Sequence, residues 1–286
     1  MAKNQKIKIG LVQASASQDL DKNLEKTAKF ISECSRKGAN IICLQELFAT
    51  RYFAQAENNG FFRLAEKIPG KITNFLSDCA KKSNVFLIGG SLFEKGEDNK
   101  CYNTSLVFDK EGKIIGKYRK VHIPYDPKYY EQYYFSPGNL GFIQVKAGNI
   151  SIAPLICYDQ WYPEASRINA LKGAKIIFYP TAIGWLKEMK EHEPWSAKRW
   201  KNAMCAQASM NGIFVAAANR VGKEEEMDFW GNSFIADPFG EIVAEASSKK
   251  EEALVAEIDL SKVKASQKGW GFLKNRQPKN YSELIK

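Results

Sequence analysis

Short apolar segments alternate with segments of helical periodicity along most of the chain, and this alternation restricts the possible folds more than any other feature. Residues 7–12 are typical of a strand, and residues 19–37 place apolar side chains on one helical face. Gly38 then favours a helix end, and residues 41–44 form a continuous apolar run. Such a run is typical of a strand buried on both faces, as in parallel sheets.

The same alternation continues to about residue 258. It predicts helices at 72–82, after Pro163 and at 194–210, and strands at 85–91, 104–109, 142–145, 150–156, 174–179, 213–218 and 254–258. Turn residues at 109–113 and 237–240 predict antiparallel hairpins. Hairpins mixed with crossover helices predict an α/β fold with mixed sheets. No linker or repeat interrupts the pattern, so we expect a single domain over residues 1–286.

Histidine and cysteine usage excludes several kinds of site. The 286 residues include only two histidines, His122 and His192, which excludes a His-rich metal centre. The closest two of the six cysteines are Cys34 and Cys43, so no CxxC pair exists and we expect reduced thiols. No stretch approaches the roughly 20 apolar residues of a membrane span. These features predict a soluble, cytoplasmic protein without a membrane partner.

The formal charge of +10 raises the possibility of nucleic-acid binding. The lysines are scattered among acidic residues and form no basic block, however, so a solvated basic surface without a nucleic-acid partner is the favoured interpretation. The sequence contains no Walker A, GxGxxG, GxSxG or HExxH pattern. Kinase, dinucleotide-binding, serine-hydrolase and zinc-peptidase functions therefore lack their usual sequence signature.

Cys157 is the most promising nucleophile because it ends the apolar strand at 150–156. Pro163 is well placed to open a helix, and Glu164 suits its first turn. We therefore expect Cys157 on a tight turn exposed at the sheet edge, where the positive end of the helix favours the thiolate. The alternative is an ordinary buried structural cysteine.

Two further strand ends carry groups that could act with a cysteine. Glu46 follows the apolar run at 41–44, and a buried glutamate has the raised pKa that suits proton abstraction. Lys120 follows the strand-like residues 114–115 and could stabilise a thiolate or an oxyanion. The alternatives are a capping or salt-bridged glutamate and a solvated Arg119–Lys120 pair.

Together these three segments resemble the nitrilase, or carbon–nitrogen hydrolase, superfamily, whose signature is a Glu–Lys–Cys triad. The matching stretches are residues 44–48, 118–124 and 156–164, in the same order and spacing. The resemblance extends to the N-carbamoylputrescine amidase branch through residues 129–138, 179–184, 230–235 and 269–271. Residues 187–193 depart from the pattern.

The resemblance implies a four-layer αββα sandwich with two mixed β-sheets, and amide-type hydrolysis with no metal and no organic cofactor. It implies that Cys157 is the nucleophile, Glu46 the general base and Lys120 the oxyanion stabiliser, with Glu131 supporting Lys120 as a fourth catalytic residue. The backbone N–H of Tyr158 would complete the oxyanion hole. It also implies a homo-oligomer, dimeric or larger. The tail after Asp259 is too aromatic for a disordered extension, so we expect an arm from about residue 260 that packs on its own subunit or at a subunit interface.

The implied reaction converts N-carbamoylputrescine and water to putrescine, carbon dioxide and ammonia. A small cationic substrate calls for carboxylates and aromatic faces. The expected substrate-binding residues are Tyr52, Asp126, Tyr130, Tyr158, Trp161, Thr181 and Ala182. A carboxylate-bearing substrate would need an arginine instead, and Arg51 and Arg167 are the candidates. The alternatives are a β-ureidopropionase, an N-carbamoyl amino acid hydrolase or an ω-amidase, and, from a different class, a non-enzymatic polyanion or nucleic-acid binder.

Overall fold

The computed structural model describes residues 6–285 and contains two large mixed sheets. The first has the order β18-β1-β2-β3-β5-β4, with β6 paired to β5. Its β1–β2 and β2–β3 pairs are parallel and its other pairs are antiparallel. Its strands are β1 (Lys6–Gln13), β2 (Ile41–Cys43), β3 (Phe86–Ile88), β4 (Leu92–Lys95), β5 (Cys101–Phe108), β6 (Ile114–Arg119) and β18 (Glu252–Asp259).

The second sheet has the order β17-β16-β13-β11-β10-β9. Its β10–β11 and β11–β13 pairs are parallel, and the outer pairs are antiparallel. Its strands are β9 (Val145–Ala147), β10 (Ile150–Pro154), β11 (Ile176–Thr181), β13 (Phe214–Asn219), β16 (Phe234–Ala236) and β17 (Ile242–Glu245). Both predicted hairpins are confirmed, as β5–β6 and β16–β17.

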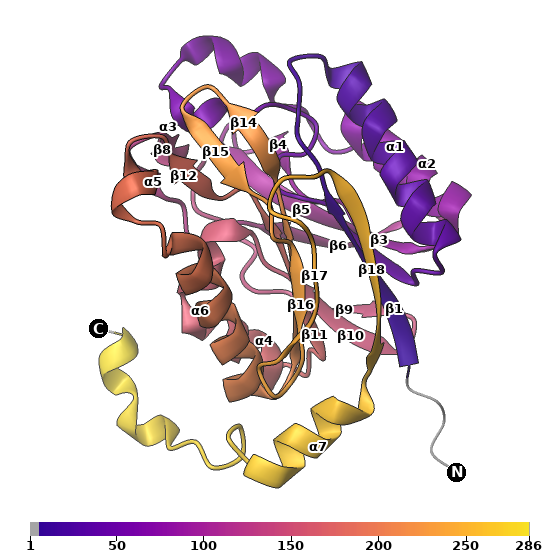
Figure 1. Cartoon of the computed structure of the whole chain (residues 1–286), viewed down its shortest axis with the longest axis vertical. Helices are drawn as coiled ribbons and strands as arrows, with labels where there is room; N and C mark the ends of the chain where they lie inside the picture. Colours follow the sequence, from indigo (N-terminus) through magenta and orange to yellow (C-terminus); the bar gives the residue numbers. More distant parts are fainter. Residues whose placement is uncertain (1–5, 286) are drawn as a thin grey trace.

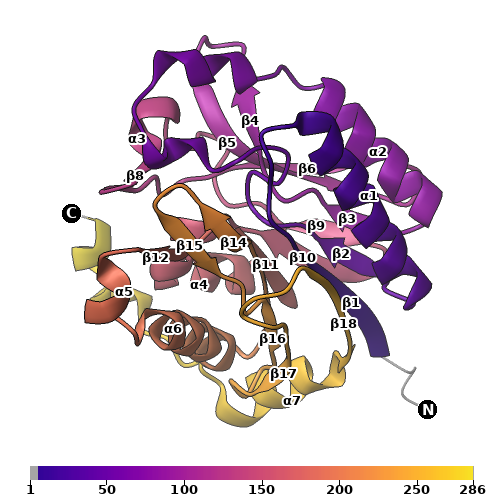
Figure 2. The same ribbon diagram turned by 45° about the horizontal axis from the view of Figure 1, so that its top comes forward.

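Helices cover the outer faces of the two sheets (Figures 1 and 2). On the first sheet lie α1 (Leu20–Arg36) and α2 (Lys71–Ser83), and on the second lie α4 (Pro163–Leu171) and α6 (Ser196–Asn211). The four layers are therefore helix, sheet, sheet and helix, which confirms the expected αββα sandwich. Asp19 begins α1 by accepting a hydrogen bond from the backbone N–H of Lys22, as helix-capping aspartates do.

Strand residues point alternately toward the other sheet and toward the helices. In β13, Phe214 and Ala216 belong to the apolar core shared by both sheets, whereas Val215 packs in the core under α4 and α6. In β1, Leu11 faces the other sheet and Val12 lies under α1 and α2. Strands buried on both faces read as continuous apolar runs, which explains why the sequence pattern predicted them.

Several short elements were not predicted. They are a small sheet of β12 (Gly184–Leu186), β14 (Val221–Glu224) and β15 (Met227–Trp230), a ribbon of β7 (Tyr125–Asp126) and β8 (Tyr129–Tyr130), and the one-turn helices α3 (Glu131–Tyr134) and α5 (Met189–His192). Elements of two to four residues are too short to establish a periodicity of 2 or 3.6. They lie where the chain leaves the large sheets, around the site described below.

The C-terminal segment leaves the sandwich after β18. Helix α7 (Ser261–Trp270) starts close to the expected beginning of the arm, and 3₁₀ turns follow at Pro278–Asn280 and Ser282–Ile285 (Figure 1). Apolar side chains along this segment are exposed, including Trp270 at 68% and Ile285 at 88%. Within residues 6–285, no helix is both long enough and apolar enough to cross a bilayer.

Candidate active site

The three sequence motifs meet at one edge of the sandwich. Glu46 follows β2, Lys120 follows β6, and Cys157 follows β10. All three are buried, and the Lys120 Nζ atom lies 2.8 Å from Glu46 Oε1. The two sheets therefore bring together a carboxylate, an ammonium and a thiol that are far apart in the sequence.

Glu131 joins this cluster as the first residue of α3. Its Oε2 lies 2.7 Å from Lys120 Nζ, and its Oε1 accepts a hydrogen bond of 2.7 Å from the Tyr52 hydroxyl. Burial on its own lowers the pKa of Lys120, but the carboxylates of Glu131 and Glu46 outweigh it and raise that pKa. Lys120 is therefore a fixed positive charge at neutral pH.

Glu46 has one oxygen engaged and one free. Oε1 accepts from Lys120 and, at 2.9 Å, from the side-chain amide of Asn103, whereas the buried Oε2 has no hydrogen-bond partner among the described residues. Burial raises the pKa of Glu46 and the charge of Lys120 opposes that rise. Because the Cys157 thiol interacts with the same carboxylate, Glu46 is placed to receive the thiol proton.

Cys157 differs from the sequence-based expectation. It is only 6% exposed, and burial, followed by the charge of Glu46, raises the pKa of its thiol well above the ordinary value. The expectation of an exposed cysteine with a favoured thiolate is therefore wrong. The physical reason is that α4 begins only at Pro163, while Cys157 opens a separate 3₁₀ turn (Cys157–Trp161) packed against Glu46.

Cys157 also adopts a φ of 38°, a conformation that few non-glycine residues adopt. Such a conformation persists only where the surroundings enforce it, and it is common at functional sites. Here it places the thiol at the junction of β10 and the 3₁₀ turn, beside the backbone of Ala182.

A buried arginine supports the loop that carries Glu46. The Arg220 guanidinium donates to the carbonyl oxygens of Glu46, Leu47 and Thr50 and pairs with Glu224 at 2.6 Å. Glu224 in turn accepts from the backbone N–H of Tyr52 at 2.7 Å. The pair satisfies carbonyl groups that would otherwise be buried without donors, and so holds this loop in one conformation.

Asp159 links the lysine and cysteine motifs. One carboxylate oxygen accepts from the Tyr118 hydroxyl at 2.7 Å and from the Ile156 N–H at 2.9 Å. The other accepts from the backbone N–H of His122 and lies 2.8 Å from His122 Nδ1. A single buried carboxylate thus ties the segments on either side of Lys120 and Cys157 to each other. The sequence offered no signal for the supporting roles of Arg220, Asn103 and Asp159.

A cavity of about 640 Å³ opens on Cys157 and Glu131. Among the expected substrate-binding residues, Asp126, Tyr158 and Trp161 line it. The cavity is also lined by residues outside that set, among them Tyr129, Ile183, Trp185, Met189, Glu193, Ser196, Arg199 and Trp230. Tyr129, Trp185, Met189 and Trp230 lie on the short elements that the periodicity missed, whereas Ser196 and Arg199 lie on α6.

The other expected substrate-binding residues lie outside the lining of this cavity. Tyr52 is behind Glu131, and Tyr130 packs against Tyr125 with ring centroids 5.7 Å apart. Thr181 and Ala182 are buried behind the catalytic cluster, where the Thr181 carbonyl oxygen accepts from the Glu46 N–H.

Neither arginine proposed for a carboxylate-bearing substrate lines the cavity of Cys157. Arg51 pairs with Glu225 at a different cavity, and Arg167 lies on α4. The arginine that does line it is Arg199 of α6, which lies over the rings of Trp161 and Trp195. Sequence periodicity predicts only that Arg199 is one of the polar residues of a helix, and it gives no sign that this side chain reaches the cavity.

This arrangement can perform nucleophilic acyl chemistry. The Cys157 thiol has a neighbouring base in Glu46, and the Lys120 ammonium offers a positive charge beside the place where an oxyanion would form. Among the described residues, no group of three or more His, Cys, Asp or Glu side chains is placed to hold a metal ion.

Comparisons with known proteins agree with this geometry. The "Carbon-nitrogen hydrolase" family model matches residues 8–268. An N-carbamoylputrescine amidase from Solanum lycopersicum is 40% identical over 99% of this chain and 96% of its own length. A citrullinase from Francisella tularensis is 36% identical over 98% of each chain.

A solved structure shows the same fold at similar identity. The crystal structure of a carbon–nitrogen hydrolase from Helicobacter pylori G27 superposes with a TM-score of 0.94 at 40% identity, over 98% of this chain and 99% of that one. These relatives are hydrolases by name, which favours an enzyme over a non-enzymatic polyanion binder. A matching sandwich, a buried cysteine with its base and lysine, and a family model that spans most of the sequence all lead to one conclusion: the chain belongs to the carbon–nitrogen hydrolase family.

Proposed function

We propose that this enzyme hydrolyses the ureido C–N bond of N-carbamoylputrescine to give putrescine, carbon dioxide and ammonia. The observation that carries the proposal is the buried Glu46–Lys120–Cys157 cluster at the end of a cavity lined by carboxylates and aromatic rings. The 40% identity to an N-carbamoylputrescine amidase over nearly the whole chain supports this substrate.

The first half of the reaction acylates Cys157. Glu46 takes the thiol proton as Sγ attacks the ureido carbon, and the resulting oxyanion is stabilised by the Lys120 ammonium and the Tyr158 N–H. Glu46 then returns the proton to the departing amine as the C–N bond breaks. A carbamoyl thioester on Cys157 remains.

The second half regenerates the thiol. Glu46 removes a proton from water, whose oxygen attacks the thioester carbon, and the C–S bond breaks as the proton returns to sulfur. The product is a carbamic acid, which loses carbon dioxide to give the second amine. Glu131 holds Lys120 in place throughout, and Tyr52 holds Glu131.

The cavity supports a cationic substrate arm. Asp126 and Glu193 provide carboxylates, and Trp161, Trp185 and Trp230 provide aromatic faces. An alkylammonium group is attracted to both kinds of surface.

Arg199 favours one second candidate, a ureido compound with a carboxylate beside its amine. Its guanidinium is the group on the cavity wall best suited to bind a carboxylate, and the Francisella relative is a citrullinase. Citrulline would use both Arg199 and the nearby carboxylates.

A comparison of three substrates tests the assignment. We expect the kcat/KM for N-carbamoylputrescine to exceed that for 3-ureidopropionate and citrulline at least about tenfold, because the loss of one charged contact costs about that much. Ammonia release measures all three. A preference for citrulline that Arg199→Gln abolishes would establish the second candidate, and a preference for 3-ureidopropionate would contradict both.

As pH is lowered, activity should begin to fall at a pH higher than the ordinary pKa of a glutamate. Glu46 must be ionised to accept the thiol proton, and burial raises its pKa. The rate is therefore full above that raised pKa and is lost as pH falls through it. A profile of kcat/KM against pH checks this, with circular dichroism at each pH to confirm folding. An acid limb at or below about pH 4.3, the value of a free glutamate, would contradict the role of Glu46.

We also propose a cytoplasmic homo-oligomer of single-domain chains. The exposed apolar side chains of the C-terminal segment, Trp270, Phe272, Leu284 and Ile285, support a role for this arm in packing against a second copy. None of the six cysteines forms a disulfide with another, and this supports a cytoplasmic location.

A further inference from the structure

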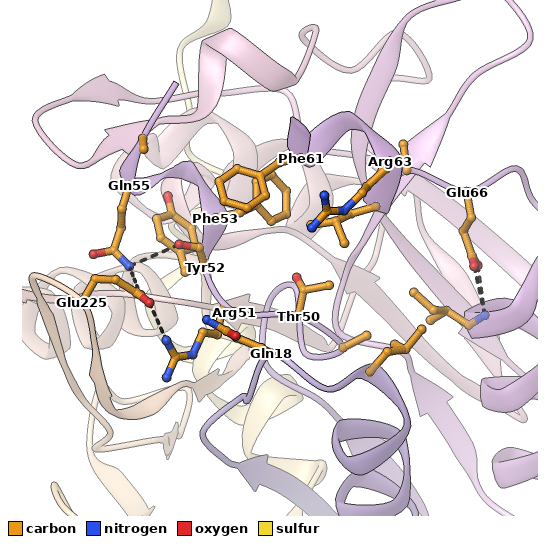
Figure 3. A pocket seen from close by; sticks show the side chains of 16 residues that line it. Gln18, Thr50, Arg51, Tyr52, Phe53, Gln55, Phe61, Arg63, Glu66 and Glu225 are labelled. Atoms are coloured by element: carbon orange, nitrogen blue, oxygen red, sulfur yellow. Dashed lines mark hydrogen bonds and ion pairs between the residues drawn. The ribbon is translucent and has the colours of Figure 1, made fainter. Parts of the chain in front are cut away.

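A second cavity of about 610 Å³ lies beside the segment that leads from Glu46 to Gln55 (Figure 3). It shares no lining residue with the cavity of Cys157. Thr50, Arg51, Tyr52 and Phe53 form one part of its wall. Its volume lies within the range of small-molecule sites, so it can hold a ligand of its own.

The acidic side chains of this cavity are already engaged. Glu66 accepts hydrogen bonds from the backbone N–H groups of Ile72 and Thr73 at the start of α2. Glu225 pairs with Arg51 and accepts from Gln55. A cation would therefore have to compete with these partners for both carboxylates.

Several polar groups of this cavity have no partner and can donate hydrogen bonds. Within the part of the chain that the structure describes, the exposed Arg63 guanidinium makes no hydrogen bond or ion pair, and the buried Thr50 Oγ1 and Arg51 Nε have no hydrogen-bond partner. Figure 3 shows the Arg63 guanidinium and the Thr50 hydroxyl directed toward the same space. Unpaired donors around one space favour an anion.

The rest of the lining is apolar. Leu20, Phe53, Phe61, Leu64 and Ile72 contribute aliphatic and aromatic surface, and the rings of Phe53 and Phe61 lie 5.9 Å apart. A bare inorganic anion would leave this surface in contact with water, whereas an organic anion would cover it. The chemistry of the site therefore calls for an acidic head group on an apolar body.

We propose that this cavity is a second ligand site, which binds a small organic carboxylate with its carboxylate on Arg63 and Thr50 and its apolar body against Phe53 and Phe61. The site goes beyond the proposed reaction because binding there needs neither Cys157 nor substrate.

Titration calorimetry with 4-phenylbutyrate and the full chain tests the proposal. We expect saturable binding to one site, with 4-phenylbutanol at least about tenfold weaker because it lacks the charge. Arg63→Gln should weaken the binding of 4-phenylbutyrate about tenfold or more. Thr50→Val removes a hydroxyl without an internal partner, and it should also weaken binding while the chain stays folded.

Two matched controls locate the site. Lys67→Gln removes one positive charge from an exposed residue outside the lining, and Arg199→Gln removes one from the cavity of Cys157. Both should bind 4-phenylbutyrate like the unmodified protein. The proposal would be overturned if 4-phenylbutyrate showed no saturable binding or if 4-phenylbutanol bound equally well. It would also be overturned if Arg63→Gln kept its affinity for 4-phenylbutyrate, or if Arg199→Gln lost it.

Discussion

Replacing Cys157 with alanine should abolish hydrolysis, with kcat falling by about 10⁵–10⁶, as in enzymes that lose a covalent nucleophile. The thiol is the group that forms the carbamoyl intermediate, and the 3₁₀ turn holds it beside Glu46. No other cysteine contacts Glu46 or Lys120 among the interactions of the described residues, so none can take its place. Ammonia release from N-carbamoylputrescine measures the loss directly.

Cys205→Ala is the matched control for this experiment. It makes the same chemical change on α6, at a half-buried position away from the catalytic cluster. We expect near-normal turnover from it. If folded Cys157→Ala protein hydrolysed the substrate at a rate comparable to that of Cys205→Ala, Cys157 would not be the nucleophile and the thioester mechanism would be wrong.

Replacing Lys120 with alanine should lower kcat by a factor of about 10²–10³, the effect of losing one oxyanion donor. The structure adds a second consequence. Lys120 neutralises two buried carboxylates, Glu46 and Glu131, and without it these like charges lie close together. The pKa of Glu46 should then rise further, because the charge of Lys120 is what opposes the effect of burial. The variant should therefore lose base strength as well as oxyanion stabilisation.

The same change should lower stability by about 3–5 kcal/mol, the usual cost of removing one partner from a buried ion pair. Thermal unfolding followed by circular dichroism measures this, and the kinetic assay is run below the unfolding transition. Lys117→Ala is a matched control, since it removes a lysine from β6, the strand that precedes Lys120, while Glu94 keeps its partner Arg119. A folded Lys120→Ala enzyme with near-normal kcat would contradict the role of Lys120.

The strands and helices of the sandwich were predictable because burial on both faces leaves a signal in the sequence itself. The apolar runs at 41–44 and 213–218 became β2 and β13, and the amphipathic stretch at 19–37 became α1 between its capping Asp19 and Gly38. The elements that line the cavity of Cys157, such as β12 and α5, are too short for any periodicity. For that reason Trp185 was not expected at the site. Arg199 lies on α6, whose helical pattern was predicted, but periodicity does not show which of its polar residues face the cavity.

The motifs around Glu46, Lys120 and Cys157 could be identified from the chain alone, because each follows a strand that its own sequence predicts. The chemistry of these three residues could not be predicted from the chain alone, because it depends on partners that are distant in the sequence. Glu46 and Lys120 are 74 positions apart, yet their side chains form one buried ion pair. The raised pKa of the Cys157 thiol arises from burial between the packed layers and from the charge of Glu46. A pKa responds to desolvation and to nearby charges, and both are set only when the two sheets pack together.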